Sequence, residues 1–127
     1  MAKSAAKPKA AVTEATQRLR AVAGAVGGQE SAEFGRLLYD RIRLGIMSAL
    51  SVNRTMSFAE LKELLETTDG NLSKHARRLE DAGLVSCRKA FADRVPRTQY
   101  SLTAKGKRAF ARHLEHMEAL IAATREE

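Results

Sequence analysis

The segment 67–102 constrains the fold most, because helical periodicity gives way in it to strand periodicity within a few residues. Its first half has apolar residues at steps of four, three and three: Leu72, Ala76, Leu79 and Ala82. This spacing places the four side chains on one stripe of a helix. The stripe predicts a helix over about 70–82 that packs one face on a core and leaves the other face open.

The two ends of this helix have residue types that helix termini favour. Thr68 and Asp69 are good N-cap residues, and Gly83 supplies the left-handed residue that commonly ends a helix. Gly70 would lie at the helix start, where free backbone N–H groups can contact a phosphate. The same glycine is equally consistent with a loop, and the sequence leaves both interpretations open.

The second half of the segment alternates as strands do. One face of the expected strands has these members: Val85, Cys87, Lys89, Phe91, Tyr100 and Leu102. Alternation over two such runs predicts a β-hairpin that is apolar at its base. Residues 92–96 are then the turn. Pro96 cannot donate to a ladder, so it belongs to the loop or to the first strand position.

Cationic side chains gather on the polar face of the helix and on the hairpin. The helix face has Ser73, Lys74, Arg77 and Arg78. The hairpin strands have Arg88, Lys89, Arg94 and Arg97, opposed only by Asp93. From Arg88 to Arg108 there are seven basic residues and one acidic residue, whereas 60–69 has four acids and one lysine. Charge concentrated in this way favours a binding surface over a general aid to solubility.

The whole chain has the size and charge of one small basic domain. It has 127 residues and a formal net charge of +7, which points to nucleic acid first and to an anionic membrane surface second. No apolar run approaches the roughly 20 residues that span a bilayer, and the basic N-terminus is not followed by the apolar core of a signal peptide. We therefore expect a cytoplasmic protein without a membrane partner.

The first 30 residues precede the main domain. Residues 1–11 are small and basic and include a proline, so we expect a disordered basic arm. Over 12–26 the apolar residues repeat in alternating steps of three and four, which predicts a helix whose seam faces another helix. Gly27 and Gly28 end it, so we interpret 12–30 as an N-terminal helix and a glycine linker.

The main domain, 31–103, has further helices before the cationic one. Asp40 follows a first apolar stretch, and it either interrupts one long helix or caps the start of a new one. Ser57 and Glu60 form an S-x-x-E capping box, so a helix should begin at Phe58. Only a few residues separate this helix from the cationic helix, as a helix-turn-helix requires.

A last helix follows the hairpin. Thr103 caps it, and we interpret the C-terminal segment 104–127 as a dimerisation helix. Its apolar residues step by four, three and four: Phe110, Leu114, Met117 and Ile121. Together with Leu19 and Val22 of the N-terminal helix, this seam is more apolar surface than one small core can cover, so we expect the end helices to form a dimer interface. The alternative is that both helices fold back on their own subunit.

Few residues suggest catalysis or metal binding. The single cysteine, Cys87, excludes an internal disulfide, and its strand position favours a small structural hydrophobe, with a redox-sensing thiol as the alternative. His113 and His116 have a spacing that can hold a metal ion, with Glu115 and Glu118 nearby, but two such histidines on a helix are usually polar surface residues, so we expect no metal site. No glycine-rich phosphate loop, paired-carboxylate cleft or nucleophile motif is present, so we expect neither an enzyme nor a cofactor.

The order helix, helix, helix, hairpin, long helix is the winged helix-turn-helix plan, and it predicts a mainly α fold with a small β-hairpin. The chain contains, in sequence, DRIRLGIMSAL, SFAELKELL, TDGNLSKHARRLEDAGLV and FADRVPRTQYSLTAKG. With these segments it resembles, over about 40–110, the small bacterial winged-helix transcriptional regulators close to the MarR and ArsR families. The resemblance implies a homodimeric, sequence-specific regulator of double-stranded DNA, acting as a repressor on a near-palindromic operator.

The resemblance also implies which side chains contact DNA. On the recognition helix and the wing they are Asn71, Ser73, Lys74, His75, Arg77, Arg78, Arg94 and Arg97. Arginine can pair with guanine edges, and lysine or serine can fix phosphates, but side-chain type does not reveal which residue does which. Asn71 is either an adenine reader or a local cap, and His75 is either a base reader or a structural histidine.

The competing interpretation is a winged helix that binds RNA or another protein without reading DNA sequence. The chain has only four phenylalanines and two tyrosines to stack on unpaired bases, which favours duplex DNA over single-stranded RNA. The sequence leaves open whether a small-molecule effector binds between the end helices and the core, because no residue identifies a ligand.

Overall fold

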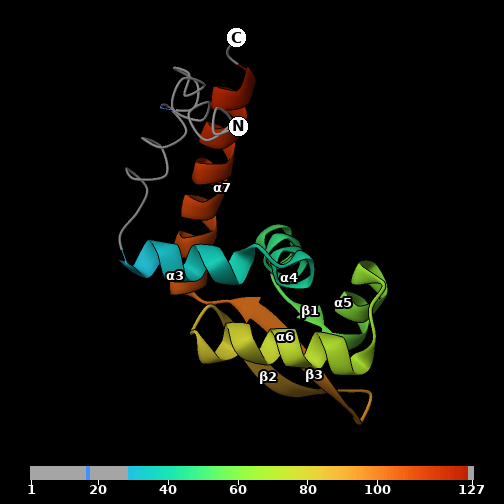
Figure 1. Ribbon diagram of the computed structural model, residues 1–127. Helices are drawn as coiled ribbons and strands as arrows, with labels where there is room; N and C mark the ends of the chain where they lie inside the picture. Colours follow the sequence, from blue (N-terminus) through green and yellow to red (C-terminus); the bar gives the residue numbers. More distant parts are fainter. Residues whose placement is uncertain (1–16, 18–28, 126–127) are drawn as a thin grey trace.

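Five helices and a three-stranded sheet make up the part of the chain that the computed structural model describes, residue 17 and residues 29–125 (Figure 1). Their order is α3 (Gln29–Leu38), α4 (Arg41–Val52), β1 (Met56–Ser57), α5 (Phe58–Leu65), α6 (Asp69–Asp81), β2 (Val85–Ala92), β3 (Val95–Leu102) and α7 (Ala104–Arg125). The expected arm, 1–11, and the expected helix with Leu19 and Val22 lie outside the described residues. The winged helix architecture predicted from the sequence is confirmed.

The helices begin where their caps predict. The Asp40 carboxylate accepts hydrogen bonds from two backbone N–H groups of the next turn, at 2.9 and 3.0 Å, so it caps α4 and separates this helix from α3. Ser57 and Glu60 form the expected capping box, and α5 begins at Phe58. Residues 29 and 30, which we assigned to the glycine linker, are already part of α3, because glutamine and glutamate are good helix formers.

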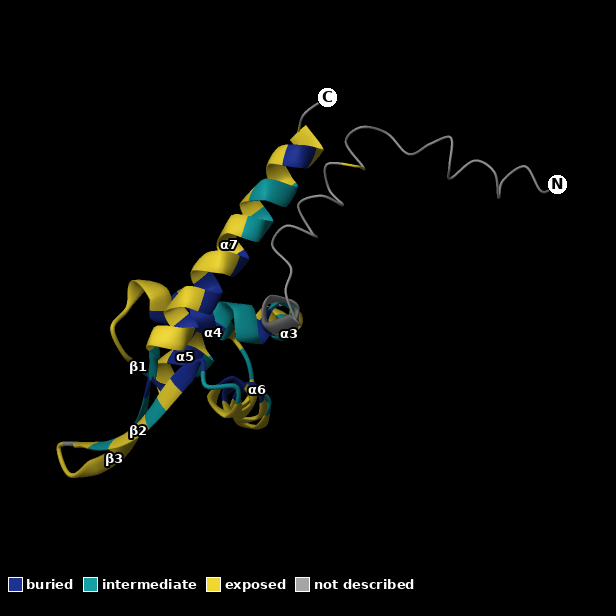
Figure 2. Cartoon of the chain, turned by 90° about the vertical axis from the view of Figure 1, so that its left-hand side faces the viewer, coloured by how far each residue is buried: buried dark blue, intermediate teal, exposed yellow. Residues whose placement is uncertain are grey.

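The sheet has the order β1-β3-β2, and both pairings are antiparallel. β2 and β3 form the expected hairpin, with Val85 opposite Leu102 and Cys87 opposite Tyr100. β1 pairs through two residues only, and the sequence did not predict it, because so short a strand shows no alternation. The outer part of the hairpin therefore has no third strand beside it and projects from the domain (Figures 1 and 2).

One hydrophobic core joins all five helices to the base of the sheet. Its largest fully buried side chains are Leu38, Ile46, Met47, Leu61, Leu72, Leu79 and Leu84. The start of α7 lies so close to the chain at Leu84 that a Cβ at Gly106 would collide with the Leu84 carbonyl. Figure 2 shows the consequence: one side of the first turns of α7 is buried against the domain, and the later turns extend beyond it.

Candidate nucleic-acid interface

The recognition helix candidate, α6, is fixed to the domain along one stripe. Leu72, Ala76 and Leu79 are almost completely buried, as the periodicity predicted. The Thr68 hydroxyl accepts a hydrogen bond from a backbone N–H of the first turn at 3.2 Å, and Gly83, with φ of +81°, follows the helix end. The predicted helix is thus confirmed to within one residue at each end.

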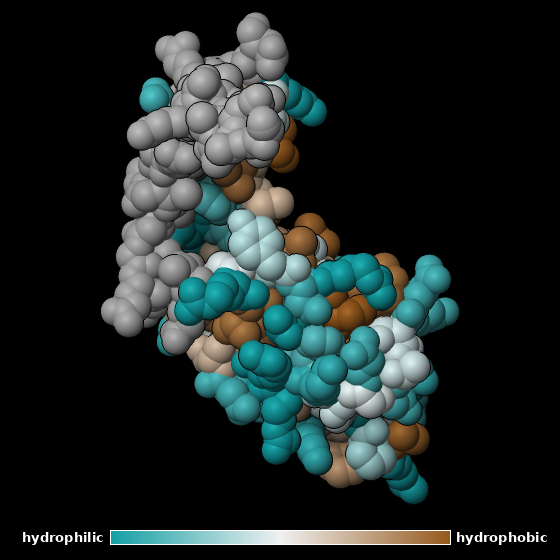
Figure 3. Space-filling model, viewed as in Figure 1, coloured by the Kyte–Doolittle hydropathy of each residue, from teal (hydrophilic) through white to brown (hydrophobic). Residues whose placement is uncertain are grey.

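The opposite face of α6 is open to solvent. The four residues expected there are all exposed: Ser73, Lys74, Arg77 and Arg78. They form two pairs four residues apart, which places each pair on one side of the same helix surface. The space-filling view shows that hydrophilic side chains dominate this side of the molecule (Figure 3).

Gly70 lies within the first turn of α6, so the loop interpretation does not hold. It is exposed, and no atom from elsewhere in the chain lies within 4 Å of the position that a Cβ would occupy. The helix start is therefore open on the side of this residue.

Two of the expected DNA-contacting residues make contacts inside the domain instead. The Asn71 amide donates a hydrogen bond to the Thr67 hydroxyl at 2.8 Å, which is the local role that the sequence left open. His75 is 8 % exposed, and its Nδ1 lies 2.9 Å from the Arg43 guanidinium. His75 is therefore a structural histidine, one of the two roles that the sequence left open. Its ring does not lie among the exposed side chains of α6.

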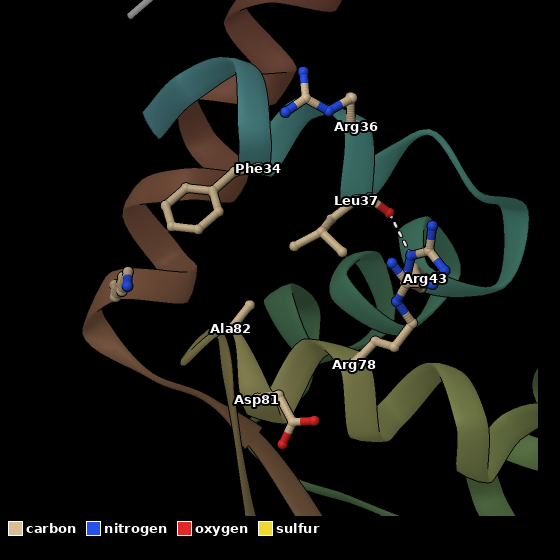
Figure 4. A pocket seen from close by; sticks show the side chains of 8 residues that line it. Phe34, Arg36, Leu37, Arg43, Arg78, Asp81 and Ala82 are labelled. Carbon is tan, nitrogen blue, oxygen red and sulfur yellow. Dashed lines mark hydrogen bonds between the residues drawn. The ribbon is translucent and has the colours of Figure 1, made fainter. Parts of the chain in front are cut away.

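Arg43 of α4 connects this helix to α3 and to α6. Its Nε donates to the Leu37 carbonyl at the end of α3 at 2.6 Å, and its Nη1 faces the His75 ring (Figure 4). A guanidinium can only donate hydrogen bonds, so Nδ1 of His75 accepts and the ring is neutral. Sequence analysis missed this contact, because 32 residues separate the two partners and neither pattern indicates the other.

Burial and neighbouring charges hold His75 in the neutral form. Partial burial lowers the pKa of its imidazole below 6.5, and the cations Arg43, Lys74 and Arg78 lower it further, although the Asp40 carboxylate, 3.7 Å away, acts in the opposite direction. Partial burial acts to raise the pKa of Asp40, but its capping hydrogen bonds and the nearby positive charges outweigh this effect and leave the pKa below 3.8.

The wing is the β2–β3 hairpin, and its turn is shorter than we predicted. Only Asp93 and Arg94 form it, with φ of 52° and 68°. Two consecutive residues with positive φ are typical of a type I′ turn, whose twist matches that of the two strands it joins. The prediction of a turn over 92–96 was wrong, because the pair lacks the glycine that usually marks such turns.

The cations of the wing are exposed, as expected. Arg94 lies in the turn and Arg97 lies on β3, where it is paired with Ala90. Pro96 pairs with Phe91 inside the ladder. The pair Ala92–Val95 closes the two-residue turn, and the next pair, Phe91–Pro96, is one of the ladder pairs that exchange no backbone hydrogen bonds. The missing N–H of Pro96 therefore removes no hydrogen bond between the two strands.

A pocket of about 720 Å³ lies behind the C-terminal half of α6 (Figure 4). Its lining combines four cations with one acid and three apolar side chains: Arg36, Arg43, Arg78, Lys105, Asp81, Phe34, Leu37 and Ala82. The Lys105 ammonium lies 5.1 Å from the centre of the Phe34 ring. The pocket therefore offers positive charge beside an aromatic wall.

The apolar seam of α7 is only partly covered. Phe110 belongs to the core, Met117 is half-buried, and Leu114 and Ile121 are 44 % and 46 % exposed. The exposed half of the seam lies on the turns of α7 that extend beyond the domain (Figure 2).

The two histidines of α7 are not the surface residues that one interpretation expected. His113 is buried beside the Tyr39 ring, and burial, followed by the nearby His116, lowers its pKa. One ring nitrogen of each histidine is buried without a hydrogen-bond partner among the described residues. Within the same residues, no group of three or more His, Cys, Asp or Glu side chains could hold a metal ion.

Residues 42–121, which run from the first turn of α4 through α5, α6 and the wing to Ile121 of α7, match the family described as the winged helix DNA-binding domain. The chain belongs to this family. In this family plan α6 has the position of the recognition helix and the β2–β3 hairpin has that of the wing, so the chain is a winged helix DNA-binding regulator. The resemblance to winged-helix transcriptional regulators is confirmed.

Proteins from two other organisms are similar in sequence to this winged helix protein. An uncharacterised protein of Methanocaldococcus jannaschii is 34 % identical over 73 residues, which cover 58 % of this chain and 79 % of the relative. A transcriptional regulator homologue from Pyrococcus horikoshii OT3 is 36 % identical, with a TM-score of 0.68 over 77 % of this chain and 99 % of that one.

A third similar structure is that of NadR in complex with 4-hydroxyphenylacetate. It is 27 % identical to the winged helix protein, with a TM-score of 0.56 over 76 % of this chain and 71 % of that one.

Among the described residues of the winged helix protein, no helix is both long and apolar enough to cross a membrane.

Proposed function

We propose that this winged helix protein is a sequence-specific repressor that binds a near-palindromic operator as a homodimer. The observation that carries the proposal is the contrast between the two faces of α6. Its apolar stripe is locked in the core, while Lys74, Arg77 and Arg78 face solvent from a rigid helix. A rigid helix of this kind fits the major groove, where arginine can pair with guanine edges in two hydrogen bonds.

The seam of α7 supports the homodimer. Leu114 and Ile121 expose large apolar surface on a helix that extends beyond the domain, and a second copy of the chain would cover it. Two recognition helices in such a dimer would meet the DNA about one helical turn apart, at roughly 34 Å, and would demand a near-palindromic site.

Selection of bound sequences from random duplexes tests the function. The wild-type protein should return a symmetric motif, and a Lys74→Ala, Arg77→Ala, Arg78→Ala triple variant should return none while it unfolds at the same temperature. An RNA-binding or protein-interaction adaptor would return no motif from duplex DNA in either case, and that result would overturn the proposal.

Sedimentation of a seam variant tests the dimer. Ile121→Glu should shift the protein towards the monomer and weaken operator binding, because a buried unpaired charge is costly. Ala122→Glu is the matched control, since Ala122 is exposed next to Ile121 on the same helix. Equal sedimentation of both variants and the wild type would contradict a dimer interface along this seam.

The pocket behind α6 supports an anionic small-molecule effector. Arg43 and Arg78 line it, and Arg43 also holds the His75 ring of the recognition helix, so a bound anion would compete for this contact. Aromatic carboxylates suit its combination of cations and an aromatic wall. Calorimetry with a series of them should show binding that Arg43→Gln weakens, and a series without binding would contradict the effector.

A further inference from the structure

The outer half of the wing is a ribbon that the core does not support. β1 pairs only opposite Gln99 and Tyr100, so the hairpin beyond the Arg88–Gln99 pair has two strands. The last wing residues that pack with the core are Cys87 and Tyr100, which face each other across the ladder. Among the described residues, none of the hairpin beyond this pair belongs to the hydrophobic core.

Phe91 lies on this unsupported ribbon and is 76 % exposed. The sequence places it on the strand face of Val85 and Cys87, and those two residues pack in the core against the helices. Because side chains alternate along a strand, Phe91 points to the helix side of the ribbon, beyond the point where the core ends. Pro96, its partner across the ladder, extends the same apolar surface.

Positive charge surrounds this apolar surface. Lys89 precedes Phe91 by two residues on the same face, and Arg94 lies in the turn beyond it. Asp93 is the only acid in the hairpin. A partner for this tip must therefore be anionic and must also offer apolar surface at close range.

The minor groove of duplex DNA meets both requirements. Its rims are phosphates, its walls are deoxyribose, and proteins place apolar side chains against its base steps. Leu79 of α6 packs in the same core as Val85 and Cys87, so the face of the ribbon that bears Phe91 is the face that meets α6 at its base. A duplex held by α6 is therefore expected to run past Phe91. These relations favour DNA over an anionic membrane as the partner.

We propose that Phe91 is the apolar contact of the wing with DNA. Its ring enters the minor groove next to the major groove that α6 occupies and packs on the deoxyribose wall, while Lys89 and Arg94 contact the flanking phosphates. Phe91 is thus an affinity-determining residue beyond the arginines of the wing. This inference rests on the proposed function.

A tryptophan at position 91 reports the contact directly, because the chain has no tryptophan of its own. In the Phe91→Trp variant, a bound operator duplex should shift the emission to shorter wavelength and protect the indole from acrylamide quenching. Val95→Trp is the control, since Val95 is 53 % exposed but lies on the opposite face of the ribbon. Its emission and quenching should change much less.

Affinity measurements separate the apolar contact from charge. Phe91→Ala should weaken operator binding about tenfold and leave the slope of log affinity against log salt unchanged, because no counterion is involved. Phe91→Leu should retain most of the affinity. An exposed side chain contributes little to folding, so both variants should unfold at the wild-type urea concentration.

The outcomes distinguish this inference from the function on which it rests. A wild-type protein that binds no duplex overturns both. A protein that binds its operator while the indole at position 91 does not respond, or while Phe91→Ala binds like wild type, overturns only the role of Phe91. An indole that responds to phosphatidylserine vesicles and not to duplex overturns it in favour of a membrane contact.

Discussion

The recognition helix and the wing both present cations to solvent, but the domain holds them in different ways. α6 is capped at its start and anchored by side chains with almost no exposed surface, such as Leu72 and Leu79. The outer wing has only its own ladder and a turn at Asp93 and Arg94. Side chains on a rigid element can be placed accurately enough to pair with base edges, whereas a ribbon tip can adapt to a phosphate backbone.

The two regions should therefore contribute different parts of DNA binding. We expect base contacts from α6 to give sequence discrimination, and phosphate contacts from the wing to give affinity that any duplex shares and that salt weakens. The following substitutions test this difference in order of the effect expected.

Removing an anchor of α6 should have the largest effect. Leu72→Ala leaves a cavity beneath the helix and should lower the free energy of unfolding by about 2–5 kcal/mol, measured by urea denaturation. The matched change on the wing, Phe91→Ala, should cost less than about 0.5 kcal/mol. Similar losses for the two variants would show that the wing is anchored as firmly as α6.

Removing a cation of α6 should mainly affect specificity. Arg77→Ala should cost about 1–3 kcal/mol of binding free energy on the selected operator and much less on a scrambled duplex, because a base-edge contact is lost. Fluorescence anisotropy with the two duplexes measures both. Equal losses on the two would remove Arg77 from the residues that contact bases.

Removing the cation at the wing tip should affect all duplexes alike. Arg94→Asn keeps a residue type that tolerates positive φ, so the turn should persist. Binding to operator and scrambled duplex should fall together, and the slope of log affinity against log salt should decrease by about one. A loss confined to the operator would instead place Arg94 on base edges.

Acid should weaken the packing around two buried histidines, His75 on α6 and His113 on α7, with the smallest effect of the series. The pKa values of His75 and His113 lie below 6.5 in the folded protein, so protons bind the unfolded chain more readily. Stability from these groups is complete above about pH 6.5 and declines as pH falls through their folded values. The urea midpoint should therefore be lower at pH 5.5 than at pH 8.

Substitution identifies the source of this pH dependence. His75→Gln should flatten the curve in part, and His113→Gln should remove a further part. Asp40 acts only at lower pH, since its pKa is already below 3.8 in the folded protein and its stabilising effect is lost as pH falls through that value. A urea midpoint that rises from pH 7 to pH 5.5 would contradict the neutral, buried state of both histidines.

Much of the fold could be predicted because local signals agreed with tertiary packing. The stripe of α6 coincides with its cap at Thr68 and with Gly83 after its end, so three independent signals fix one helix. The capping box at Ser57 fixes the start of α5 in the same way. The base of the hairpin was predictable because its apolar alternation continues into the core.

What could not be predicted depends on contacts between distant segments. Alternation placed Phe91 on the correct strand face, but it could not show that Cys87, four residues earlier, is the last residue of that face to pack in the core. The contact of Arg43 with His75 joins two helices through side chains that both could have been surface residues. The same holds for the candidate site. The exposed cations of α6 could be predicted from the sequence, whereas the buried contact between Arg43 and His75 behind them could not.

A guanine analogue in the operator tests the central claim most directly. The account holds that Arg77, on the open face of α6, contacts a base edge in the major groove. Replacing guanines of the selected motif one at a time with 7-deazaguanine, which lacks the N7 acceptor, should weaken wild-type binding at one position in each half-site. The same replacement should not weaken the Arg77→Ala variant further, because both changes remove one contact. Losses that add at every position would contradict the claim.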